Sequence, residues 1–154
     1  GAALTEALAA RPFLVKPNNH ELAELAGCDA ADEAAVVAAA RDLARAGTRF
    51  VLVSCGAAGA LLVDAKGLIA RGAAPAGALV NSVGAGDSMV AGFLAGLAGA
   101  SLPGCESLCP GADDAVYALR LGLAAGSATA FSPSLASAGQ VSDLLPVTFV
   151  EPCN

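Results

Sequence analysis

The sequence predicts an α/β protein with a doubly wound, mostly parallel sheet flanked by helices. Short apolar segments alternate along the chain with longer segments that carry helix-capping residues at their starts. Strands that alternate with helices favour a layered fold in which parallel strands place a binding site at their carboxyl ends. The length of 154 residues suits about one domain, and the hydrophobic fraction of 56% is sufficient for a core.

Capping residues and glycines mark the boundaries of the expected elements. Gly47 ends one helical segment, and Ser137 with Gln140 forms the capping-box pattern that starts the last helix. A turn at residues 65–67 separates two short strands. The expected helices cover residues 4–11, 18–27, 32–46, 88–97, 112–131 and 137–145, and the expected strands cover residues 13–15, 49–54, 60–64, 68–70 and 147–150.

The charge and the cysteine content argue against several classes of function. The net charge is −6 and the sequence has no basic stripe, so we expect no nucleic-acid partner. The uncharged run at residues 88–105 is rich in alanine and glycine and contains Pro103, so we expect no membrane span there. The five cysteines form no C-x-x-C pair, and their odd number fits reduced thiols in a cytoplasmic protein.

Residues 84–87, with the sequence GAGD, are the most informative feature for function. Two glycines and an alanine leave backbone N–H groups accessible to an anion, and the helix that follows adds its N-terminal dipole. Asp87 adds a carboxylate beside this cradle, a combination that suits phosphoryl transfer to a hydroxyl. Taken alone, these four residues are more simply explained as a glycine turn with a capping aspartate.

Four segments of the chain, in this order, resemble the motifs of the phosphofructokinase-B carbohydrate kinases, which have the ribokinase-like fold. Residues 15–21 (VKPNNHE) resemble the K-P-N-x-x-E element of that family. Residues 53–60 (VSCGAAGA) resemble its strand–glycine-turn–strand element. Residues 84–87 resemble its ATP-site signature, and residues 126–132 (GSATAFS) resemble the helix end that lines its adenine pocket.

The resemblance implies an enzyme that uses ATP and Mg²⁺ to phosphorylate a sugar hydroxyl. It implies that Asp87 is the general base of this reaction. The implied anion hole for the transferred phosphoryl group consists of Gly84, Ala85 and Gly86. The implied nucleotide contacts are Lys16, Asn18, Ser54, Gly56, Gly59 and Ser127, and the implied metal-site residues are Glu21 and Asn18.

Several of these residues also have a purely structural explanation, which the sequence leaves open. Asn18 and Glu21 satisfy the capping-box pattern at a helix start. Lys16 equally suits a role in shielding the end of a sheet. The glycines of residues 53–60 suit a plain β-turn, and the small residues at 126–132 suit close packing between helices.

The segment 81–88, NSVGAGDS, is more similar to the 1-phosphofructokinase and tagatose-6-phosphate kinase branch of the family than to ribokinases and adenosine kinases. This likeness implies a small-molecule sugar phosphate as substrate, namely a phosphorylated ketohexose such as fructose 1-phosphate. Two alternatives stay open. One is a ribokinase-like or adenosine-kinase-like activity on another substrate, and the other is a nucleotide-binding or regulatory module without turnover.

The resemblance further implies that residues 1–154 are the C-terminal, ATP-binding part of a carbohydrate kinase domain. In the family, a preceding half binds the sugar and supplies a lid, and no segment of this chain matches either. We therefore expect the isolated chain to be inactive and the full-length protein to be a candidate homodimer. Residues 104–114, with two cysteines, receive no functional explanation from the sequence.

Overall fold

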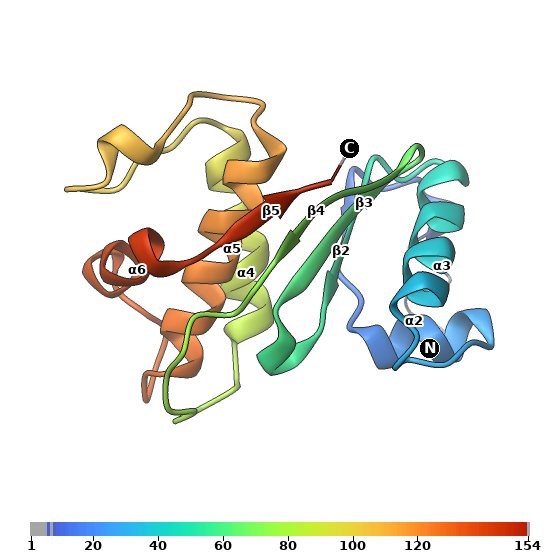
Figure 1. The fold of residues 1–154 in the computed structure, drawn as a ribbon, viewed down its shortest axis with the longest axis horizontal. Helices are drawn as coiled ribbons and strands as arrows, with labels where there is room; N and C mark the ends of the chain where they lie inside the picture. Colours follow the sequence, from blue (N-terminus) through green and yellow to red (C-terminus); the bar gives the residue numbers. More distant parts are fainter. Residues whose placement is uncertain (1–5, 7, 154) are drawn as a thin grey trace. The chain divides into compact units, whose positions relative to one another are not determined.

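The computed structural model describes residue 6 and residues 8–153 (Figure 1). The helix expected over residues 4–11 lies partly outside the described residues. The described chain divides into two compact units. The first unit comprises the residues up to 56, residues 60–71 and Cys153, and the second unit comprises residues 57–59 and 72–152.

The first unit places two helices beside hydrogen-bonded strands. Asn18 and Asp32 cap the two helices with their side chains, and capping is one of the two alternatives that the sequence leaves open for Asn18. Gly27 ends the first helix in the left-handed conformation at φ 68°, which glycine adopts without strain. The elements are β1 (Leu14–Val15), α2 (Asn19–Ala26), α3 (Glu33–Arg45), β2 (Phe50–Ser54), β3 (Ala60–Asp64) and β4 (Gly67–Gly72), which ends at the first residue of the second unit. Their buried core includes Val15, Leu22, Val36, Ala40, Val51, Val53, Leu61 and Val63.

The sheet is mixed, so the expected mostly parallel sheet is wrong. Its strand order is β1-β2-β3-β4-β5, in which β5 is Val150–Pro152. β1 is parallel to β2, with Leu14 opposite Phe50, whereas β2 and β3 are antiparallel, with Val51 opposite Val63. A parallel crossover needs about a dozen residues or more. Residues 55–59 are too few for one, so the glycine turn produces a hairpin.

The second unit contains α4 (Ala85–Leu97), α5 (Ala115–Ala130), α6 (Ala138–Leu144) and β5. α5 begins later than the expected residue 112, because the side chain of Asp114 accepts a hydrogen bond from the N–H of Tyr117 at 2.8 Å. The expected last strand is also displaced. Leu145–Val147 forms a 3₁₀-helix, and the hydroxyl of Thr148 donates to the carbonyl of Leu144 at 2.8 Å, so β5 begins at Val150. The predicted capping box of α6 is confirmed.

α4 and α5 lie against each other through glycines, with their backbones in close approach. A Cβ placed on Gly92 would lie 2.7 Å from the carbonyl oxygen of Leu121, and one on Gly96 would lie 2.8 Å from the Cα of Ala118. A Cβ on Gly126 would lie 3.0 Å from the carbonyl oxygen of Ala85. The end of α5 is therefore next to the start of α4, and the two helices are antiparallel.

Over the part of the chain that the structure describes, no helix has the length and apolar character that a bilayer crossing requires.

We predict that Gly122→Ala destabilises the chain. Its Cβ would lie 2.8 Å from the carbonyl oxygen of Met89, and this backbone atom cannot yield like a flexible side chain. The overpacking penalty of about 1–3 kcal/mol outweighs the helix-propensity gain of roughly 1 kcal/mol. Urea unfolding followed by circular dichroism measures the change.

The matched control for this prediction is Gly139→Ala in α6. Gly139 has only the hydroxyl of Ser137 near its Cβ position, at 3.8 Å. This variant should be as stable as the parent protein or slightly more stable, because alanine is the better helix former. Equal stability of both variants would contradict the proposed close contact between α4 and α5.

Candidate functional site

Residues 84–87 form the start of α4 and not a loop ahead of it. Gly84 is the N-cap residue at φ 81°, and the helix begins at Ala85, earlier than the expected residue 88. Asp87 is therefore in the first turn, where the helix dipole favours a negative charge, and its side chain is exposed. The sequence does not show this start because Gly84 has no side chain and thus no capping signal.

The N–H groups at this helix start differ in their availability. Ala85 was expected to donate to an anion, but its N–H already donates to the carbonyl of Ser82 at 3.2 Å. No side chain caps the first turn of α4. The N–H groups of Gly86 and Asp87 occupy first-turn positions that lack acceptors within a helix, so these two amides are best suited to bind an anion.

The end of α5 lies beside this helix start but is largely buried. The carbonyl of Ala85 approaches Gly126, and Ser127 is only 9% exposed. The carbonyl oxygen of Ser127 accepts a hydrogen bond from the N–H of Phe131 at 2.9 Å. Close helix packing therefore explains Gly126 here, whereas the predicted nucleotide contact of Ser127 stays a prediction.

Thr129 is a polar residue at this place that sequence reasoning did not single out. Its hydroxyl donates to the Oγ of Ser88 at 2.8 Å, and the side chain is buried. The available signal was a hydroxyl-bearing residue among the small residues of segment 126–132, which resembles the family motif.

A second group of predicted site residues comes together in the first unit, where β1 and β2 end. The Nζ of Lys16 donates to the Oγ of Ser54 at 3.4 Å. The N–H of Ser54 donates to the carbonyl of Pro17 at 3.0 Å, and Asn18 forms a parallel β-bridge with Ser54. The structure thus brings Lys16, Asn18 and Ser54 together at the carboxyl ends of two parallel strands, as expected for this fold class.

Asn18 and Glu21 form a complete capping box at the start of α2. The N–H of Glu21 donates to Asn18 Oδ1 at 2.7 Å, and the N–H of Asn18 donates to Glu21 Oε2 at 2.8 Å. The structure therefore confirms that Asn18 and Glu21 cap a helix, which was the structural explanation that the sequence left open. It does not exclude a second role, because the side chain of Glu21 is exposed.

Asn18 and Glu21 suit a magnesium ion only if water and phosphate supply most of its ligands. Among the described residues, no group of three or more His, Cys, Asp or Glu side chains could hold a metal. Mg²⁺ commonly binds through one or two carboxylates, with waters and substrate phosphates completing its shell. The exposed carboxylate of Glu21 meets that limited requirement.

The two glycines of the β2–β3 turn have different environments. Gly56 has φ 56° and open space where a Cβ would lie. Gly59 has φ 105°, and a Cβ there would collide with the carbonyl oxygen of Gly72. Gly59 is therefore required by the local packing, and Gly56 is the glycine that leaves an accessible backbone surface.

Comparisons with known proteins place these features in a family. A family model described as pfkB family carbohydrate kinase matches residues 2–140. The 1-phosphofructokinase of Bacillus subtilis (strain 168) is 43% identical over 146 residues, which are 95% of this chain and 44% of that protein.

Solved structures give the same result. Phosphofructokinase-2 from Escherichia coli, in complex with substrates and products, matches with a TM-score of 0.75 and 33% identity over 95% of this chain and 44% of that one. Arabidopsis thaliana ribokinase complexed with ribose and ATP matches with a TM-score of 0.66 and 25% identity over 86% of this chain and 40% of that one. The chain thus spans less than half the length of each of these proteins.

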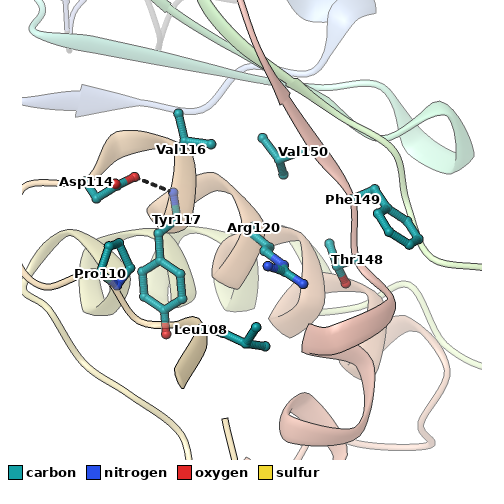
Figure 2. A pocket seen from close by; sticks show the side chains of 9 residues that line it. All are labelled: Leu108, Pro110, Asp114, Val116, Tyr117, Arg120, Thr148, Phe149 and Val150. Carbon is teal, nitrogen blue, oxygen red and sulfur yellow. Dashed lines mark hydrogen bonds between the residues drawn. The ribbon is translucent and has the colours of Figure 1, made fainter. Parts of the chain in front are cut away.

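A cavity of about 390 Å³ lies in the second unit, and no predicted site residue lines it (Figure 2). The hydroxyl of Tyr117 donates to the carbonyl of Ala100 at 2.9 Å, so the cavity is near the end of α4 opposite Asp87. The guanidinium of Arg120 donates to two backbone carbonyls at 3.1 and 3.2 Å. The lining residues are Leu108, Pro110, Asp114, Val116, Tyr117, Arg120, Thr148, Phe149 and Val150.

Tyr117 should resist ionisation in the folded protein. Burial raises its pKa to about 12, and the neighbouring thiol of Cys109 acts in the same direction. An unfolded tyrosine has a pKa of about 10. The raised pKa of Tyr117 therefore adds to the free energy of unfolding in full below about pH 10, and this addition is lost as the pH rises toward about 12.

The measurement is an ultraviolet titration of phenolate, which is specific because Tyr117 is the sole tyrosine and the chain has no tryptophan. At about pH 11 the folded protein should remain mostly protonated, whereas the guanidinium-unfolded chain should be mostly ionised. The same midpoint in both states would contradict the prediction.

Proposed function

Because the chain belongs to the pfkB family of carbohydrate kinases, we propose that it is the C-terminal, ATP-binding part of a sugar kinase. The chain aligns with a segment that makes up 44% of the length of a 1-phosphofructokinase, which supports this proposal. The sugar-binding half and the lid would then belong to a preceding part of the same protein. Turnover requires that the sugar hydroxyl be held in line and that water be excluded, so the isolated chain would be inactive.

The proposed reaction is phosphorylation of a hydroxyl on a phosphorylated ketohexose such as fructose 1-phosphate. The 43% identity to the Bacillus subtilis 1-phosphofructokinase supports this substrate over ribose, because the ribokinase structure is only 25% identical. A homodimer of the full-length protein stays a prediction.

The observation that carries the proposal is the position of Asp87 in the first turn of α4. The exposed carboxylate lies one residue beyond Gly86, and no side chain caps this turn. Asp87 would accept the proton of the attacking sugar hydroxyl, and the amides of Gly86 and Asp87 would donate to the anionic oxygens that develop charge. When bound, MgATP supplies the phosphoryl group and part of the charge neutralisation.

The first unit would hold the nucleotide phosphates and the metal ion. The Nζ of Lys16 lies 3.4 Å from the Oγ of Ser54. The lysine charge and the serine hydroxyl would therefore both be available to the same phosphate group. Gly56 leaves room for close approach to the backbone. Asn18 and Glu21 would hold Mg²⁺ through water while they continue to cap α2. Gly59 and Ser127 remain proposed nucleotide contacts through the backbone turn and the end of α5.

Asp87→Asn should abolish most of the kinase activity of the full protein. Asparagine keeps the shape of the side chain but cannot accept the proton, so kcat should fall by about 10²–10⁴-fold while ATP affinity changes little. Steady-state kinetics with fructose 1-phosphate and MgATP measure kcat, and nucleotide titration measures affinity.

The matched control is Asp143→Asn, an equally conservative change at an exposed position of α6. It should leave kcat unchanged. If Asp87→Asn keeps most of the wild-type kcat, Asp87 is not the base. If the wild-type protein binds nucleotide but shows no turnover on any sugar, the nucleotide-binding module is the correct function.

Glu21→Gln should raise the Mg²⁺ concentration needed for half-maximal activity and leave the melting temperature nearly unchanged. Glutamine also satisfies the N3 position of a capping box, so the helix start survives while the charge near the metal is lost. The control is Glu24→Gln, which removes the same charge from an exposed position of the same helix. If both variants show the same Mg²⁺ dependence, Glu21 has no role at the metal ion and only caps α2.

A further inference from the structure

We infer that Thr129 is a positioning residue whose hydroxyl holds the first turn of α4, and with it the carboxylate of Asp87, in the geometry that catalysis requires. This inference rests on the proposed function, because it assigns Thr129 a role through Asp87. It concerns residues of the second unit only.

The start of α4 lacks the usual means of fixing a helix end. Gly84 is the N-cap residue and offers no side-chain hydrogen bond to the first turn. Asp87 is exposed, so burial does not fix the position of its carboxylate. A first turn without a capping side chain frays readily, so this turn needs support from elsewhere.

Thr129 provides that support from the neighbouring helix. Its hydroxyl donates to the Oγ of Ser88 at 2.8 Å and accepts from the N–H of Ala136 at 3.2 Å. Thr129 is only 1% exposed, so water does not compete well for these bonds. Among the described residues, this is the side-chain hydrogen bond that reaches residues 84–88 from outside α4.

The bond from Thr129 also joins α4 to the turn that follows α5. The carbonyl of Ala130 accepts hydrogen bonds from the N–H groups of Val80 and Asn81 at 2.8 and 3.1 Å. The side chain of Leu135 lies so close to Gly84 that a Cβ there would be 2.8 Å from its Cδ2. Residues 80–88 and 129–136 are thus held to each other, and the hydroxyl of Thr129 is the central polar contact.

Removal of the Thr129 hydroxyl is expected to displace the carboxylate of Asp87 without weakening nucleotide binding. A general base must lie within hydrogen-bond reach of the proton that it accepts, and a displacement of about 1 Å can lower the rate by about 10²-fold. Removal of the Thr129 hydroxyl leaves Asp87, Lys16 and Ser54 chemically unchanged. The rate constant should therefore fall more than the affinity for nucleotide.

The experiment compares Thr129→Val with Thr129→Ser and Thr148→Val in the full protein. Valine has the shape of threonine without its hydroxyl, and serine keeps the hydroxyl. Thr148 is the matched control, because it is equally buried and its hydroxyl also donates a hydrogen bond, but to the backbone carbonyl of Leu144 in the segment after α6. Ser88→Ala removes the same bond from its other side and serves if Thr129→Val does not fold.

The first measurement is amide hydrogen exchange of the ligand-free protein. Thr129→Val and Ser88→Ala should speed exchange at the N–H groups of Ala85 and Ser88, which donate to Ser82 and Gly84 in the native state. Amides in the last turn of α4 should keep their wild-type rates, which separates local loosening from general destabilisation. Thr129→Ser and Thr148→Val should leave the first turn protected.

The second measurement is steady-state kinetics. Thr129→Val and Ser88→Ala should lower kcat by about 10-fold to 10²-fold with little change in KM for ATP, and Thr129→Ser should restore kcat. The inference is overturned if folded Thr129→Val has the kcat of Thr148→Val, or if exchange at the first turn speeds up while kcat does not change. Failure of the proposed function gives a different result, because Asp87→Asn would then retain activity.

Discussion

The close approach of α4 and α5 is the constraint on which the candidate site depends. Glycines at the contact bring backbone atoms of the two helices together, because Cβ atoms on Gly92, Gly122 and Gly126 would lie only 2.7, 2.8 and 3.0 Å from carbonyl oxygens of the other helix. Side chains of normal size would push the helices apart and change their register. Because Gly126 meets the carbonyl of Ala85, this contact fixes where the first turn of α4 begins relative to the end of α5. The position of Asp87 follows from that register.

Local interactions could be predicted from the sequence, because each depends on residues a few positions apart. The capping boxes of Asn18 with Glu21 and of Ser137 with Gln140 both form as expected. The boundaries of α3 and β3 also agree with the expected ranges, because Asp32 marks the helix start and glycines bound the strand. In each case a side chain or a glycine carries the signal.

The structure differs from the sequence-based expectations where contacts with a distant part of the chain determine the local conformation. The start of α4 at Ala85 has no side-chain signal, and the hydrogen bond that reaches this turn joins Ser88 to Thr129, 41 positions further along the chain. The last strand begins at Val150, where the carbonyl of Phe149 accepts a hydrogen bond from Ala73 and the N–H of Cys153 donates to Ile69. These long-range bonds do not appear in local periodicity. Alternation of strands and helices predicts a mostly parallel sheet, whereas the short strand–turn–strand at 53–60 is compatible only with an antiparallel pair.

The proposed function requires an acidic chain to attract an anionic nucleotide. The net charge is −6, so the overall field of the chain disfavours ATP. Arg71 is paired with Glu33, and Arg120 bonds backbone carbonyls, so these two cations serve the fold. Under the proposed function, Lys16 would supply positive potential in the first unit, and the first-turn amides of Gly86 and Asp87 would supply it in the second unit. The metal ion that accompanies the nucleotide would add to both. Backbone amides supply that potential only while their helix start is held in place. At the start of α4, the proposed anion binding therefore depends on the same helix register that positions Asp87.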